Sequence, residues 1–131
     1  LAAEKNELKV VADQYGCPTF AADIAQALLT MAEQYFSGKP VQWGTYHFCG
    51  AAGATWFDFA AAIMETAWEK GLIHQKIPVL PISTDQFPTP AARPAYSVLD
   101  CSKIRHVFGI RQKDWQEGLE RMLEEQRQPH E

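Results

Sequence analysis

The sequence predicts an α/β fold of mixed helices with a few short strands, and three observations lead to it. Two segments, 20–37 and 55–71, carry apolar residues at steps of three and four, the period of an amphipathic helix. Short β-favouring runs come before both segments. Between 78 and 94, five prolines in seventeen positions exclude a helix and leave too few N–H groups for a central strand.

The first third of the chain is expected to form a strand, a loop and a helix. The β-favouring run 8–12 is the strand, and 13–18 contains the Gly and Pro of a turn. Thr19 stands at the expected N-cap of helix 20–37, which Gly38 and Pro40 end. The apolar stripe that this helix should bury consists of Phe20, Ile24, Ala25, Leu28, Ala32 and Tyr35.

The middle of the chain is expected to add a strand at 44–49 and a helix whose start resembles a capping box, Thr55-x-x-Asp58. Segment 77–82 contains two prolines and is an edge strand at best. We expect four apolar side chains to fix the proline-rich segment to a core: Phe87, Tyr96, Val98 and Leu99.

The last third is expected to contain two helices that begin at carboxylates. Asp100 would cap a short helix that ends at Gly109, and Asp114 would cap the final one. The tail Gln126–Glu131 is expected to fray. The final helix should bury four apolar side chains: Trp115, Leu119, Met122 and Leu123.

The composition is that of one globular domain, with 131 residues, 47% hydrophobic and 21% charged. A net charge of −4 argues against a nucleic-acid partner, which usually selects a basic surface. No apolar run reaches the roughly 18 to 20 residues that cross a bilayer, so no membrane partner is expected. Cys17, Cys49 and Cys101 lack metal-site spacing and suggest free, buried thiols in the reducing cytoplasm.

Two local patterns resemble the cofactor-binding loop and the catalytic Tyr-x-x-x-Lys pair of dehydrogenases. Gly50–Thr55 follows a predicted strand and opens a helix, but it has no third glycine and no acidic residue about twenty positions later. Tyr35 and Lys39 have Tyr-x-x-x-Lys spacing, but Gly38 and Pro40 place Lys39 beyond the helix. We therefore interpret the first pattern as a plain turn, and we expect no cofactor-binding residue in this chain.

The histidines share no metal-ligand spacing, and we interpret His47 as a hydrogen-bonded core residue. No Gly-x-Ser-x-Gly elbow and no Cys/His nucleophile pair appears in the sequence. We expect neither a catalytic residue nor a metal ligand in this chain.

Two polar segments stay unexplained by folding alone, 13–19 and 84–100. The second holds Arg93 between prolines, where the side chain loses little freedom when its guanidinium binds an anion. Pairing of Arg93 with a neighbouring carboxylate is an equal alternative on these grounds.

The chain resembles dTDP-4-dehydrorhamnose reductases, members of the extended short-chain dehydrogenase superfamily, in four blocks. The first is Val10-Val-Ala-Asp-Gln-Tyr-Gly-Cys-Pro-Thr19 with the helix Phe20–Leu28, and the second is Gly44-Thr-Tyr-His-Phe-Cys-Gly50 leading to Thr55–Ile63. Thr89-Pro-Ala-Ala-Arg-Pro-Ala-Tyr-Ser-Val-Leu-Asp100 is the third, and Phe108-Gly-Ile110 with Trp115-Gln-Glu-Gly-Leu119 is the fourth. The resemblance implies that residues 1–131 form the C-terminal sugar-nucleotide-binding domain of such an enzyme, without its N-terminal Rossmann domain.

The resemblance also implies a function. Such enzymes reduce the C4 keto group of dTDP-4-dehydro-L-rhamnose with NADPH or NADH, in the biosynthesis of cell-surface polysaccharides. Arg93 matches the residue that meets the pyrophosphate, and Gln14 and Thr19 border the substrate cleft. The catalytic and cofactor-binding residues would lie upstream of Leu1, family members form homodimers, and some use Mg²⁺.

Two other functions remain open at this point. The same fold serves non-catalytic regulatory subunits, such as the β subunit of methionine adenosyltransferase. It also serves nucleotide-sugar reductases and epimerases of different specificity. Residues upstream of Leu1 would distinguish them.

Overall fold

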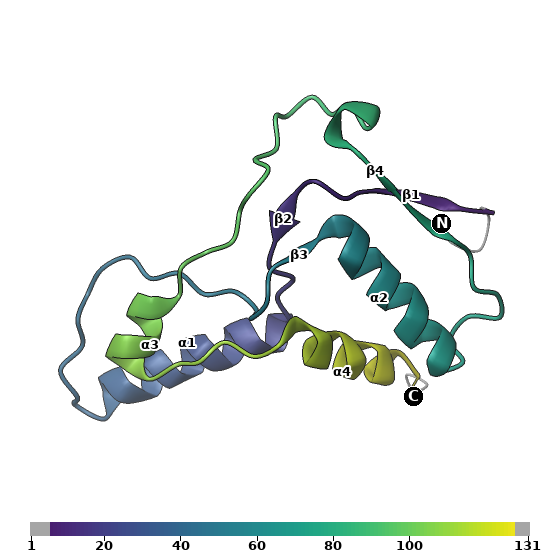
Figure 1. The fold of residues 1–131 in the computed structure, drawn as a ribbon. Helices are drawn as coiled ribbons and strands as arrows, with labels where there is room; N and C mark the ends of the chain where they lie inside the picture. Colours follow the sequence, from purple (N-terminus) through teal and green to yellow (C-terminus); the bar gives the residue numbers. More distant parts are fainter. Residues whose placement is uncertain (1–5, 128–131) are drawn as a thin grey trace.

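The computed structural model describes residues 6–127, and in that range it combines helices with short strands (Figure 1). Strand β1 (Leu8–Val11) pairs in parallel with β4 (Val79–Ile82), and β2 (Tyr15–Gly16) pairs antiparallel with β3 (Ala54–Thr55). The predicted class of mixed helices with a few short strands is therefore confirmed. Strand β1 confirms the strand expected at 8–12, and β4 is an edge strand, as Pro81 within it requires.

Helix α2 (Trp56–Glu69) lies between the β1–β4 ribbon and helix α4 (Trp115–Arg127), as Figure 1 shows. The first of two apolar cores forms where α2 and α4 meet. Its buried members are Ala54, Ala67, Trp115, Leu119 and Leu123, with Met122 packed beside them. The apolar face predicted for the last helix is confirmed.

The second core joins helix α1 (Ala21–Phe36) to helix α3 (Ser102–Phe108) and to the irregular segment 41–50. Helix α3 ends at Gly109, whose φ of 71° lies in the left-handed region that glycine tolerates best. The buried members of this core are Ala27, Cys49, Cys101, Ile104, Phe108 and Ile110.

Helices α2 and α4 start at the side-chain caps that the sequence predicts. The Thr55 hydroxyl accepts a hydrogen bond from the backbone N–H of Asp58, and the Asp58 carboxylate accepts one from the N–H of Thr55. The Thr55 hydroxyl also donates to the Asp58 carboxylate at 2.7 Å, and this bond, with the one from the Thr55 N–H, lowers the pKa of Asp58. Asp114 accepts from the N–H of Gln116 at 2.8 Å and caps α4 as predicted. Asp100 accepts from the N–H of Ser102, one residue before the structural N-cap.

Helix α1 starts and packs differently from the prediction. Its N-cap is Phe20, and the Thr19 hydroxyl instead donates to the carbonyl of Cys17 and accepts from the N–H of Gly50. The predicted apolar stripe is also wrong, because Ile24, Leu28 and Tyr35 are 42%, 58% and 51% exposed. The inward residues of this helix are Asp23 and Ala27.

Three further expectations about the middle of the chain are wrong. Residues 44–49 form no strand, and two of their carbonyls accept from side chains rather than from a neighbouring strand: Lys103 donates to Thr45 and Gln112 to Cys49. His47 is exposed on this irregular segment, not a core residue. Phe87, Tyr96 and Leu99 are exposed and do not fix the proline-rich segment, whereas Val98 is half-buried beside Gly53.

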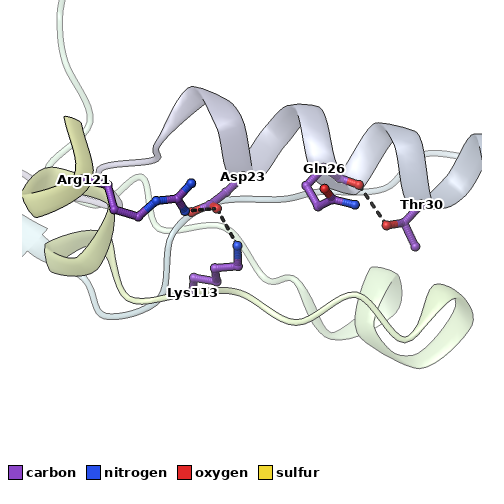
Figure 2. A network of polar contacts seen from close by, with 5 residues as sticks. All are labelled: Asp23, Gln26, Thr30, Lys113 and Arg121. Carbon is purple, nitrogen blue, oxygen red and sulfur yellow. Dashed lines mark hydrogen bonds and ion pairs between the residues drawn. The ribbon is translucent and has the colours of Figure 1, made fainter. Parts of the chain in front are cut away.

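The carboxylate of Asp23 determines which face of α1 turns inward (Figure 2). Lys113 donates to its Oδ1 at 2.9 Å, and Arg121 of α4 lies 3.7 Å from the same oxygen. The Arg121 guanidinium also lies over the ring of Phe20, 5.0 Å from its centroid. A carboxylate buried to this degree needs such partners, so the pairing fixes the rotation of α1 about its axis.

Helix α4 approaches the start of α1 closely because residue 118 is a glycine. A Cβ at Gly118 would lie 2.7 Å from the Cβ of Phe20, closer than real Cβ contacts. The absent side chain therefore lets α4 rest directly on Phe20.

No helix within residues 6–127 has both the length and the apolar character that a bilayer span requires. The termini, at 1–5 and 128–131, lie outside the described residues, and so does most of the predicted frayed tail.

We predict that Asp23→Ala lowers the free energy of unfolding by about 1.5–3 kcal/mol, the range of a hydrogen bond to a charged group. Urea titration followed by tryptophan fluorescence measures the change. Lys113→Gln is the matched control and should cost less, because Arg121 still faces the carboxylate. Equal losses for the two variants would contradict the assignment of Asp23 as the shared partner.

Candidate functional site

The candidate site is a cavity of about 560 Å³ at the end of the β1–β4 ribbon. It brings together Arg93 and Gln14, two of the three substrate-binding residues predicted from the sequence. Its other lining residues are Lys9, Val10, Val11, Trp56, Phe87 and Thr89.

Thr84 positions the loop that carries Gln14, one side of this cavity, through hydrogen bonds to Asp13 and Gln14. The Asp13 carboxylate accepts hydrogen bonds from the Thr84 backbone N–H at 2.9 Å and from its hydroxyl at 2.6 Å. Gln14 Nε2 donates to the same Thr84 hydroxyl oxygen at 3.0 Å. Through these bonds the loop after β1 is fixed to the 3₁₀ helix Thr84–Gln86. The same bonds from Thr84 lower the pKa of Asp13.

Hydrogen bonds at Ala95 and Ser97, just after Arg93, attach the segment that carries Arg93 to the backbone of Tyr15. The N–H of Tyr15 donates to the carbonyl of Ala95, and the N–H and hydroxyl of Ser97 both donate to the carbonyl of Tyr15. These bonds bring the two polar segments singled out in the sequence into contact. Arg93 itself is exposed, two residues before this attachment and directly before Pro94.

The cavity combines two exposed aromatic rings with two cations. Trp56 and Phe87 are each 57% exposed. Lys9 and Arg93 supply positive charge, and Val10 and Val11 supply apolar surface. Exposed rings bind planar groups by stacking, and guanidinium groups bind phosphates with paired hydrogen bonds. The arrangement therefore suits a ligand that joins a planar ring to an anion.

The sequence did not indicate Trp56 or Lys9 as site residues. Trp56 directly follows the cap residue Thr55, and the core face of α2 is set by Phe59 and Ile63. A large aromatic residue at the first helical position and outside that face was the available signal. Lys9 carries no comparable signal, because an exposed strand lysine is common.

Thr19, the third predicted substrate residue, lies in a different place. It lines a neighbouring cavity of about 270 Å³, together with Cys17, Cys49, Ser97 and Leu99. Its hydroxyl donates a hydrogen bond to the carbonyl of Cys17 and accepts one from the N–H of Gly50. These bonds keep Gly50 beside the loop that precedes α1.

The Gly50–Thr55 turn does not fit a dinucleotide pyrophosphate. A Cβ on Gly50 would collide with the carbonyl oxygen of Pro18, and one on Gly53 would lie 3.3 Å from Val98 Cγ2. Protein atoms thus occupy the space that such glycines leave for phosphate. The Asp58 carboxylate also occupies the helix N-terminus, where it would repel an anion.

Tyr35 and Lys39 do not share a helix face. Helix α1 ends at Phe36, and Gly38 has a φ of 76°, so Lys39 lies beyond the helix as predicted. The ring of Tyr35 packs edge-on against Trp43 instead, with 5.6 Å between the centroids.

Metal-binding geometry is not found in the part of the chain that the structure describes. Among residues 6–127, no group of three or more His, Cys, Asp or Glu side chains is arranged to hold a metal ion.

We predict that Asp13→Asn destabilises the protein near neutral pH and much less in acid. Folding lowers the pKa of Asp13 below its ordinary value of 3.8, so its contribution is complete above that pH. The contribution is lost as the pH falls through the lower folded-state pKa. Urea titrations at about pH 6 and about pH 2.5 should show the difference between wild type and variant shrinking.

Asp85→Asn is the matched control, because Asp85 is an exposed carboxylate on the same 3₁₀ helix. It should change stability little at either pH. A loss for Asp13→Asn that is the same at both pH values would contradict the role of its ionised form.

Comparison with known proteins gives a consistent result. Over residues 1–128 the chain matches the family described as the RmlD substrate binding domain. It is 44% identical to the dTDP-4-dehydrorhamnose reductase of Aggregatibacter actinomycetemcomitans, over 91% of this chain and 40% of that protein. It is 40% identical to the reductase of Sinorhizobium fredii, over 94% of this chain and 41% of that protein.

Solved structures agree in fold. The dTDP-4-dehydrorhamnose reductase of Bacillus anthracis, determined in complex with NADP, is 36% identical with a TM-score of 0.79 and covers 95% of this chain and 40% of that one. The reductase of Clostridium acetobutylicum is 31% identical with a TM-score of 0.82 and covers 96% and 41%. The chain thus spans about 40% of the length of these relatives. The match over residues 1–128 and these likenesses place the chain in the RmlD substrate-binding domain family.

Proposed function

We propose that this chain is the nucleotide-sugar-binding part of a dTDP-4-dehydrorhamnose reductase. The enzyme would reduce the C4 keto group of dTDP-4-dehydro-L-rhamnose to give dTDP-L-rhamnose, a precursor of cell-surface polysaccharide. The observation that carries the proposal is the cavity in which Arg93 and Gln14 meet Trp56 and Phe87. The names of the relatives at 44% and 40% identity support the choice of substrate.

Each lining residue has a role in this proposal. The Arg93 guanidinium binds the diphosphate with paired hydrogen bonds. Lys9, which also lines the cavity, is ion-paired with Glu7 at 3.3 Å and adds less charge. Trp56 and Phe87 offer ring faces to the thymine base. Gln14 Nε2 donates a hydrogen bond to the Thr84 hydroxyl, so its Oε1 can accept one from a ligand hydroxyl. Thr19 remains a predicted contact through the neighbouring cavity.

The reducing cofactor, NADPH or NADH, would be bound by the part of the reductase outside this chain. The relative from Bacillus anthracis was determined with NADP. When bound, the nicotinamide supplies the hydride, and this chain positions the sugar that accepts it. Mg²⁺ stays a prediction from the resemblance, and we assign it to no residue.

We further propose a homodimer that acts in the cytoplasm. The three cysteines are free, as a reducing compartment would keep them. An apolar surface on α1 and the segment after it supports burial against another part of the assembled enzyme. Its residues are Leu28, Leu29, Tyr35, Phe36 and Trp43, all at least 51% exposed.

We predict that Arg93→Ala, in a reductase that contains this chain, weakens dTDP binding by about 1.5–3 kcal/mol, the range of a hydrogen bond to a charged group. Isothermal titration calorimetry with dTDP measures the loss. Arg93→Lys should recover only part of it, because an ammonium group cannot form the paired bonds.

Arg111→Ala is the control for a general loss of positive charge, since Arg111 lines a different cavity. It should leave the Kd for dTDP unchanged. An unchanged Kd for Arg93→Ala would remove Arg93 from the site.

We predict that the 131-residue chain alone shows no NADPH-dependent reduction of dTDP-4-dehydro-L-rhamnose, because the proposal places its catalytic groups elsewhere in the reductase. Absorbance at the NADPH band, with a complete relative as positive control, measures turnover. Measurable turnover by the chain alone would contradict this division of roles.

A further inference from the structure

Three thiols far apart in the sequence meet in the core between α1 and α3. The Sγ atoms of Cys49 and Cys101 lie 3.7 Å apart, and these residues are only 4% and 5% exposed. Cys17 packs against the same core. The spacing of the cysteines in the sequence indicated separate buried residues, and the fold instead makes them neighbours.

The Cys49–Cys101 pair is placed for a disulfide. A disulfide requires sulfur atoms about 2.05 Å apart, so the two would have to approach by about 1.7 Å. Neither residue lies inside a helix: Cys49 ends the irregular segment 44–49, and Cys101 is the N-cap of α3. Both thiols lie 3.8 Å from the carbonyl oxygen of Leu99, so the two side chains are directed toward the same point.

Access from outside differs among the three cysteines. The cavity of about 270 Å³ is lined by Cys17 and Cys49, and Cys101 is not among its lining residues. Gln112 Nε2 lies 3.4 Å from the Cys49 sulfur, beside its shorter hydrogen bonds to the carbonyls of Cys49 and Gly50. Burial and the neighbouring Cys49 thiol raise the pKa of Cys17 to about 11, so Cys17 holds little reactive thiolate. Cys17 is the less buried of the two cavity thiols, but Cys49 combines contact with the cavity and a thiol neighbour at 3.7 Å, so oxidation of Cys49 is the event that can lead to a cross-link.

We propose that Cys49 and Cys101 form a reversible oxidation site that responds to hydroperoxides. The Cys49 sulfur attacks the peroxide O–O bond and becomes a sulfenic acid, and the peroxide is reduced to water or an alcohol. The Cys101 sulfur then attacks the sulfenic sulfur, forms the S–S bond and releases water. A cellular dithiol restores both thiols by disulfide exchange.

The cross-link would join residues 52 positions apart, and the loop it closes contains α2, β4 and the Arg93 segment. A cross-link restricts the unfolded chain, so the oxidised protein should resist denaturant better than the reduced one. This gives a readout that is independent of any enzyme activity and of the proposed function.

The test exposes the reduced 131-residue chain to hydrogen peroxide, blocks remaining thiols with N-ethylmaleimide and maps the peptides by mass spectrometry. Chymotrypsin is the protease of choice, because it cuts at Phe20 and Phe48 and so separates Cys17 from Cys49. Trypsin would leave both in one peptide, since the only Lys or Arg between 10 and 69 is Lys39, which precedes proline.

We expect a peptide pair linked through Cys49 and Cys101, a labelled Cys17, and a higher urea midpoint that dithiothreitol reverses. Three labelled thiols after peroxide treatment would overturn the proposal. So would a Cys17–Cys49 link as the main product, or a Cys49 sulfinic acid without any link.

Variants test the order of events. Cys101→Ser should leave a sulfenic acid at Cys49 that dimedone captures, and Cys101→Ala serves if the serine disturbs the core. Cys17→Ser is the matched control and should form the same cross-link at the same rate. Dimedone on Cys17 alone, or loss of the cross-link in Cys17→Ser, would overturn the assignment of Cys49 as the first thiol oxidised.

Discussion

The ion-paired carboxylate of Asp23 is the constraint on which the arrangement of the helices depends. A carboxylate on the inner side of a helix is tolerated only beside cations, and Lys113 and Arg121 provide them from two later segments. This pairing turns Ala27 toward α3 and leaves Leu28 facing outward. Because Arg121 belongs to α4, and α4 also packs on α2, one carboxylate sets the relation between the two apolar cores.

The candidate site lies on the elements that the two apolar cores hold in place, but no buried member of either core lines its cavity. Its walls are the end of β1, the first residue of α2 and the segment from Thr84 to Arg93. Hydrogen bonds of Thr84 and Tyr15 hold these parts together, not apolar burial. The aromatic and cationic side chains of the cavity can therefore face outward without exposing the interior.

The features predicted best from the sequence are helix starts and ends that depend only on residues close together in the chain. The Thr55–Asp58 capping box, the Asp114 cap and the helix end at Gly109 depend on residues within a few positions, and all three were found. The buried face of α1 was predicted wrongly, because Asp23 finds its partners about ninety residues later. Apolar spacing alone could not show that a charged residue would decide this face.

The same distinction holds for the site. Arg93 and Gln14 were indicated by polar, proline-bounded segments, and the fold places them in one cavity. Trp56 could not be assigned there without knowing that the end of β1 lies beside α2. The meeting of Cys49 and Cys101 depends on how segment 44–49 and the N-cap of α3 pack, which no spacing rule encodes.

The contact of α4 with Phe20 has an evolutionary consequence. Gly118 is a buried position inside α4, and in a helix interior alanine is ordinarily favoured over glycine by about 1 kcal/mol. Here that methyl group would lie within 2.7 Å of the Phe20 Cβ, which no side-chain rotation can move. Positions 20 and 118 are thus steric partners 98 residues apart. Substitutions at position 118 should therefore appear among relatives only with a shift of the backbone at position 20, so drift at one site is restricted by the other.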